Sequence, residues 1–92
     1  MSDNMCSVEL LIQNKKGLHA RAAASFVKCA EEFDAEVSVE RLGQTVSGCS
    51  IMGLMMLAAS CGTKINVCAT GLQAQEAIKA LSLLVNCKFG EE

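Results

Sequence analysis

The apolar residues of this 92-residue chain repeat with two different periods, which alternate along the sequence. Over residues 6–12 every second residue is apolar, which is the period of a strand that turns one face to a core. Over residues 20–32 the apolar residues recur at intervals of three and four, which is the period of an amphipathic helix. A chain of this length has room for one core, so we expect a single domain, residues 1–92, in which both kinds of element share it.

The strand period returns over residues 35–40, 44–47 and 64–70, and the helix period over residues 51–59 and 72–87. The predicted order is therefore β-α-β-β-α-β-α. Four strands with one apolar face each and three helices pack economically as an α+β fold, an open-faced two-layer sandwich with one antiparallel sheet and three helices on one face. In the helix over residues 51–59 we expect Leu54, Leu57 and Ala58 to face inward.

Charge and hydropathy disfavour several classes of function. A formal net charge of −2 gives no basic face for nucleic acid. The first four residues are polar and do not resemble a secretory signal. The longest apolar run, over residues 51–59, is too short to span a bilayer. We therefore expect a soluble cytoplasmic protein with no nucleic-acid or membrane partner.

The six cysteines stand at positions 6, 29, 49, 61, 68 and 87. They form no C-x-x-C pair, and the chain has one histidine to complete a metal set. Several fall inside predicted helices or strands, where cysteine commonly serves as a small buried apolar residue. Reduced thiols are the favoured interpretation, and a zinc site or a thiol function is the weaker alternative.

The only histidine, His19, stands where a strand has ended and the helix over residues 20–32 begins. Gly17 can adopt a turn conformation that other residues disfavour. His19 should then lie at or near the N-cap, beside backbone N–H groups that favour an anion. Arg21 adds a cation suited to phosphate oxygens. We predict positive surroundings for the ring, which would leave it neutral and nucleophilic, in a small exposed site for phosphoryl transfer.

A simpler interpretation of the same residues stays open at this point. A single histidine near a helix start is more often a capping or surface residue than a reactive one. An arginine two positions later is usually solvated. Local physical arguments alone do not decide between the two interpretations of His19 and Arg21.

Two longer motifs resemble the HPr family, the phosphocarriers of the bacterial phosphotransferase system. The segment 17–21 (GLHAR), followed by Ala23 and by residues 26–27 (FV), is similar to the active-histidine signature of that family. Residues 43–46 (GQTV) and 50–55 (SIMGLM) resemble its regulatory-serine region, at the family's separation. The resemblance covers roughly the whole chain and implies the sheet order 1-4-2-3.

By this resemblance His19 is the residue that is phosphorylated, on its Nδ1 atom, and Arg21 is its charged neighbour. The implied donor is an enzyme I-type protein charged by phosphoenolpyruvate, and the implied acceptor is an enzyme IIA-type protein. The chain would be a substrate of phosphotransferases rather than an enzyme, with no cofactor and no metal. A monomer fits a carrier that offers one face to successive partners.

The chain departs from the family at Ala22, where a proline usually follows the arginine. Position 22 would be about the third residue of the helix, where alanine is acceptable and a missing N–H matters little. We expect a slightly looser first turn with the site retained. The departure favours a regulatory, nitrogen-related branch of the system over a dedicated sugar-uptake carrier.

Ser50 reads as the N-cap of the helix over residues 51–59. The resemblance implies that it is also phosphorylated by an HPr kinase/phosphorylase, where the added charge would alter how partners bind rather than unfold the chain. The alternative function is a non-catalytic regulatory module that acts through Ser50 and protein binding, with His19 incidental.

The helix over residues 51–59 is too apolar for one buried face to account for. Adaptable methionine side chains suit a surface that meets several partners. We expect Ile51, Met52 and Met55 to form a docking surface together with Ala20, and the resemblance places the partner-binding face there. The simpler alternative is that these residues belong to the core.

Overall fold

The computed structural model describes residues 4–91. Its strands are β1 (Met5–Leu11), β2 (Glu36–Arg41), β3 (Gln44–Ser47) and β4 (Lys64–Thr70), and its helices are α1 (Ala20–Ala30), α2 (Ile51–Met56) and α3 (Ala74–Asn86). A short 3₁₀ helix, η1 (Lys88–Gly90), follows α3. The predicted order of the seven main elements is confirmed, although several boundaries move by up to three residues.

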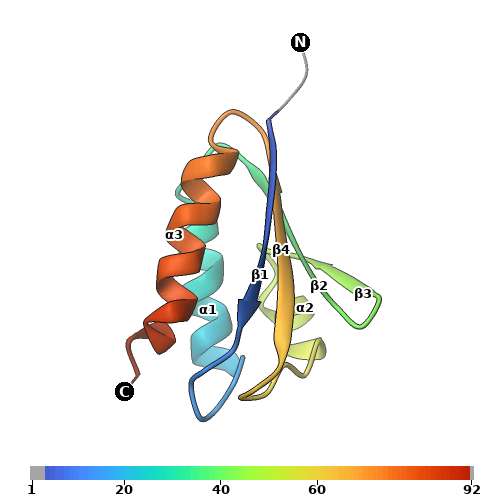
Figure 1. The fold of residues 1–92 in the computed structure, drawn as a ribbon, viewed down its shortest axis with the longest axis vertical. Coiled ribbons are helices and arrows are strands. Elements are labelled where there is room, and N and C mark those ends of the chain that lie inside the picture. Colours follow the sequence, from blue (N-terminus) through green and yellow to red (C-terminus); the bar gives the residue numbers. More distant parts are fainter. Residues whose placement is uncertain (1–3, 92) are drawn as a thin grey trace.

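The four strands form one antiparallel sheet in the order β1-β4-β2-β3, as the resemblance implied. Helices α1 and α3 lie side by side and cover one face of the sheet (Figure 1), and α2 packs against α1 and β3. The structure is therefore the predicted α+β two-layer sandwich with an open sheet face.

The core lies between the sheet and the helices, and the predicted periods account for it. Alternate residues of the central strands are buried, among them Val39 of β2 and Val67 of β4, each 0% exposed. From α1, Phe26 is also 0% exposed and is the largest fully buried side chain. The apolar stripes predicted for α1 and α3 are buried or half-buried along their length.

Helix α2 ends earlier than predicted, and one inward residue was wrongly assigned. Leu54 and Leu57 are buried, but Ala58 is exposed and Ala59 is buried in its place. The cause is the backbone of Ala58, which adopts a left-handed φ of 53° and so takes the chain out of the helix. A helical period extended through this position therefore gives the wrong face.

The C-terminal segment contains η1, which no periodic pattern in the sequence predicts. Lys88 and Phe89 have φ values of 56° and 55°, which fold the chain back after α3. Phe89 is 9% exposed and packs into the core. This turn carries Glu91 back over the start of α1.

Candidate functional site

The loop before α1 is held against the segment that follows α2. The Leu18 N–H donates to the Ala59 carbonyl at 2.8 Å. Gly17 has a φ of +66°, and a Cβ there would lie 2.6 Å from the same carbonyl oxygen, so only glycine fits. These two contacts fix where the chain enters α1.

His19 is the N-cap of α1, as predicted, with extended backbone angles of φ −78° and ψ −179°. Its side chain does not cap the helix, so the ring is free to interact elsewhere. The first amides of any helix have no intrahelical acceptor, and they give this end of α1 a partial positive charge.

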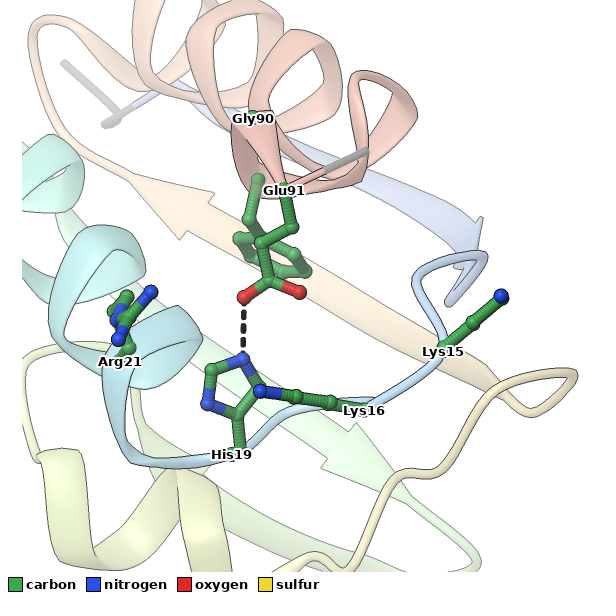
Figure 2. Close-up of a pocket in the computed structure, with 7 residues that line it drawn as sticks. Lys15, Lys16, His19, Arg21, Gly90 and Glu91 are labelled. Atoms are coloured by element: carbon green, nitrogen blue, oxygen red, sulfur yellow. Dashed lines mark hydrogen bonds and ion pairs between the residues drawn. The ribbon is translucent and has the colours of Figure 1, made fainter.

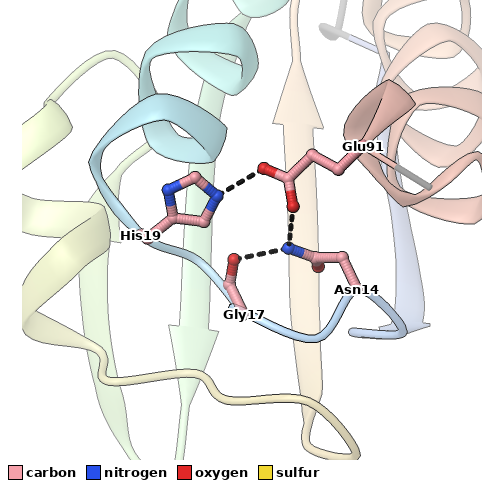
Figure 3. Close-up of polar contacts among 4 residues, drawn as sticks. All are labelled: Asn14, Gly17, His19 and Glu91. Atoms are coloured by element: carbon pink, nitrogen blue, oxygen red, sulfur yellow. Dashed lines mark hydrogen bonds and ion pairs between the residues drawn. The ribbon is translucent and has the colours of Figure 1, made fainter.

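The ring of His19 contacts a carboxylate from the end of the chain. Its Nε2 atom forms a hydrogen bond with Oε2 of Glu91 (Figure 3). The side chains are partly exposed, His19 by 26% and Glu91 by 16%. Within residues 4–91, Nδ1 has no hydrogen-bond partner, and it lies on the side of the ring away from Glu91.

Asn14 links this carboxylate to the loop. Its Nδ2 donates to Oε1 of Glu91 at 2.9 Å and to the Gly17 carbonyl at 2.8 Å (Figure 3). Asn14 is 0% exposed, and its Oδ1 has no partner among the described residues. An unpaired buried acceptor is unfavourable. The two hydrogen bonds that Nδ2 donates offset this cost of burying Asn14.

The pKa of the Glu91 carboxyl is lowered from its ordinary value. The main cause is the hydrogen bond with His19, followed by the hydrogen bond from Asn14, and the positive charge of Lys16 adds to the effect. Glu91 is therefore ionised at neutral pH. An ionised carboxylate only accepts hydrogen bonds, so Nε2 of His19 carries the hydrogen in this contact.

The predicted positive surroundings of His19 are only part of what the structure shows, because Glu91 places a negative charge on one side of the ring. No local pattern in the sequence indicates this contact. The two residues are 72 positions apart, and they meet through the turn at Lys88 and Phe89.

An open pocket of about 390 Å³ lies beside the ring (Figure 2). It is lined by His19 and Glu91, by the basic residues Lys15, Lys16 and Arg21, and by Phe89 and Gly90. Arg21 is exposed and makes no hydrogen bond or ion pair within the described part of the chain. Side-chain cations in the pocket beside the ring suit a phosphoryl group attached to it, although Lys15 points away from the ring in Figure 2.

The structure thus brings His19 and Arg21 together as predicted, and it adds Lys15 and Lys16. The sequence signal for these two lysines was present, since they directly precede Gly17. Without the fold, however, a pair of lysines in a turn is indistinguishable from an ordinary solvated surface.

Ser50 is the N-cap of α2, as predicted. Its Oγ accepts a hydrogen bond from the Gly53 N–H at 2.9 Å. The side chain of Ser50 is half-buried. The structure places Ser50 at the start of the exposed face of α2 and apart from the pocket beside His19.

The residues expected to form the docking surface are exposed. Ile51, Met52 and Met55 are exposed by 40%, 72% and 41%, so the alternative that they belong to the core is wrong. Ala20 is also exposed. A second shallow depression, lined by Lys16, Leu18, His19 and residues 58–60, joins the histidine to the segment that follows α2.

The six cysteines are free thiols. Within residues 4–91 no three His, Cys, Asp or Glu side chains are grouped to hold a metal ion. In the same part of the chain, no helix has the length and apolar character needed to cross a membrane.

Comparison with known proteins places these features in one family. Residues 6–86 match the family model described as PTS HPr component phosphorylation site. The phosphocarrier protein HPr of Neisseria meningitidis serogroup A is 48% identical over 92% of this chain and 93% of its own length. The phosphocarrier protein NPr of Shewanella violacea is 40% identical over 90% of this chain and 91% of its own length.

Solved structures agree with this match. The crystal structure of HPr-C-His from Thermoanaerobacter tengcongensis has a TM-score of 0.91 and 46% identity, and the match covers 95% of this chain and 98% of that one. A crystal structure of an HPr dimer from the same organism has a TM-score of 0.76 and 46% identity, and the match covers 91% and 97%.

Proposed function

The chain belongs to the HPr family of phosphocarrier proteins of the phosphotransferase system, and from this we propose that it accepts a phosphoryl group on His19 and passes it to another protein. Its relatives are phosphocarriers, which carry a phosphoryl group rather than catalyse a reaction. The observation that carries the proposal is a partly exposed imidazole at a helix N-cap, in a pocket with Lys15, Lys16 and Arg21.

The proposed donor is an enzyme I-type protein charged by phosphoenolpyruvate, and the proposed acceptor is an enzyme IIA-type protein. We place this exchange in the cytoplasm and take the carrier to act as a monomer. The open pocket supports this proposal because a partner's phosphoryl group can reach the ring directly. Arg21 would contact the phosphoryl oxygens.

Incubation with phosphoenolpyruvate and a matching enzyme I should add one acid-labile phosphate to the unmutated chain. His19→Ala should abolish it, and Arg21→Ala should slow it while leaving the site of labelling unchanged. The control is an established HPr, which must be labelled by the same enzyme I. If that control is labelled and this chain is not, the proposal is wrong.

We further propose that Ser50 is a regulatory phosphorylation site for an HPr kinase/phosphorylase. The supporting observation is its position beside the exposed residues Ile51 and Met52. A phosphate there would bring negative charge to the surface where we propose that partners dock. Acid and base treatment separates the two modifications, since phosphohistidine is acid-labile and phosphoserine is not. Phosphate that survives acid and disappears in Ser50→Ala is the expected result.

The choice between the sugar-transport and nitrogen-related branches stays a prediction that rests on Ala22. Relatives named HPr and a relative named NPr both match over most of the chain. Ala22 is the third residue of α1, as expected, and is 0% exposed.

A further inference from the structure

An imidazole ring can bond to phosphorus through either of its two nitrogens. In the neutral ring one nitrogen carries a hydrogen and the other carries the lone pair that attacks. Which nitrogen is which depends on the hydrogen bond that the other one makes. The partner of one ring nitrogen therefore decides where a phosphoryl group can be attached.

In this protein the Nε2 atom of His19 has a fixed partner. Glu91 accepts its hydrogen, and the ionised carboxylate has no hydrogen to donate in return. In the neutral ring, Nδ1 is then the nitrogen with the lone pair, and it has no hydrogen-bond partner in residues 4–91. The ring is thereby presented with one reactive nitrogen.

Three interactions restrain the Glu91 carboxylate. Asn14, which is fully buried, donates to its second oxygen at 2.9 Å. The packing of Phe89 into the core anchors the turn that carries it. Lys16 contributes an attractive charge. A carboxylate held in this way can orient a ring, whereas a freely moving surface glutamate would not.

We propose that Glu91, supported by Asn14, is a positioning residue that directs the phosphoryl group to Nδ1 of His19 by keeping the ring hydrogen on Nε2. This inference rests on the proposed function of His19 as the phosphoryl acceptor. It assigns a role to a residue near the end of the chain that lies outside the matched family segment, residues 6–86.

Nε2 keeps its hydrogen throughout phosphoryl transfer to and from Nδ1. The Nδ1 lone pair forms a bond to phosphorus while the bond between phosphorus and the donor's leaving atom breaks, and the leaving atom takes that electron pair. The ring becomes positively charged, and the Glu91 carboxylate lies beside that charge. On transfer to an acceptor the Nδ1–phosphorus bond breaks, its electron pair returns to Nδ1, and Nε2 still holds its hydrogen.

The test uses the full chain and phosphoramidate, an inorganic donor that phosphorylates imidazole with loss of ammonia, so no partner protein is needed. With the histidine labelled by ¹⁵N, NMR distinguishes the Nδ1 product from the Nε2 product. The unmutated chain should give almost only the Nδ1 product. In Glu91→Ala the ratio of Nε2 to Nδ1 product should rise about tenfold, the effect of losing one charge-assisted hydrogen bond.

The matched control is Glu76→Ala, which removes an acidic residue from the first turn of α3 and should leave the ratio unchanged. A second readout is the Nε2–H proton signal, which the carboxylate should protect from exchange with water in the unmutated chain and not in Glu91→Ala. The same product ratio in both chains, or an Nε2–H signal that Glu91→Ala leaves unchanged, overturns the role of Glu91.

Failure of the positioning role and failure of the proposed function give different results. If Glu91 has no role, His19 is still labelled by enzyme I, with unchanged phosphoramidate products in Glu91→Ala. If His19 is not the physiological acceptor, enzyme I fails to label the chain, although phosphoramidate still shows a preference for Nδ1 that depends on Glu91.

Discussion

The side chains of Asn14 and Glu91, 77 positions apart, are joined by a hydrogen bond of 2.9 Å that ties the loop before α1 to the end of the chain. Because the other oxygen of the same carboxylate holds the His19 ring, the geometry of the histidine depends on how the last turn folds. A site that appears local in the sequence is therefore assembled from both ends of the chain.

Replacement of Asn14 by alanine should lower the free energy of unfolding by about 1–2 kcal/mol, because it removes a buried donor with two acceptors. Urea denaturation measures this change. Asn66→Ala is the matched control, since Asn66 is exposed on β4, and it should change the stability by no more than about 0.5 kcal/mol. Equal effects of the two substitutions would contradict the role that we assign to Asn14.

The lowered pKa of Glu91 predicts a stability term that depends on pH. The folded-state pKa lies below the ordinary value of 4.5, so the contact contributes its full stability above that pH. The contribution is lost as pH falls below 4.5 through the lowered folded-state value. The groups that face the carboxylate are His19, Asn14 and Lys16.

The measurement is the difference in unfolding free energy between the unmutated chain and Glu91→Ala from neutral pH down to about pH 3, below the ordinary range of carboxylates. The difference should favour the unmutated chain near neutrality and shrink in the acid range. A difference that grows as the pH falls below 4.5 would have the wrong sign for an ionised, hydrogen-bonded Glu91.

Most of the fold could be predicted from the sequence because it depends on short-range periods. Alternation in β4 and the three-and-four spacing in α1 identified the buried faces, including Val67 and Phe26. The position of His19 at the N-cap followed from the same patterns, since a glycine turn separates a strand period from a helix period.

The parts that could not be predicted depend on left-handed backbone at residues other than glycine. Ala58, Lys88 and Phe89 all have positive φ values, and nothing in their side chains indicates this. The backbone turn at Ala58 leaves Ala58 exposed and buries Ala59 instead. The other two bring Glu91 to His19, a contact that no local pattern encodes.

Two glycine substitutions should separate backbone strain from steric clash. Gly17 and Gly43 both have positive φ, +66° and +82°, but a Cβ at position 17 would meet Ala59 and Ser60 whereas one at position 43 would meet nothing within 4 Å. Gly43→Ala should cost about 1 kcal/mol from the backbone alone. Gly17→Ala should cost about 2 kcal/mol more, because the neighbouring backbone must move.

Thermal or urea unfolding of both glycine variants provides the comparison. Gly17→Ala should also displace the NMR signals of Leu18 and His19, because the loop that positions them shifts. If both variants lose the same stability, the close approach of Gly17 to Ala59 does not constrain the loop.

Ser50→Ala should destabilise the chain by about 1 kcal/mol, since it removes the Oγ that caps the Gly53 N–H. Ser50→Thr keeps a hydroxyl that can cap the helix and should stay close to the unmutated chain. Urea denaturation of the three proteins tests the order. A Ser50→Ala chain as stable as the unmutated one would show that the cap is not important for α2.

Replacement of Met52 by glutamate tests the proposed docking surface on α2. Met52 is 72% exposed, so the substitution should change the unfolding free energy by no more than about 0.5 kcal/mol. A charge at the centre of an apolar contact should nonetheless slow phosphoryl transfer from enzyme I about tenfold. The matched control is Leu83→Glu on α3, a residue with a similar exposure of 64% that lies outside the proposed surface. Equal transfer rates for the two variants would place the partner elsewhere. A loss of rate confined to Met52→Glu would assign the exposed face of α2 to docking. The pocket beside His19 would then hold the phosphoryl group alone.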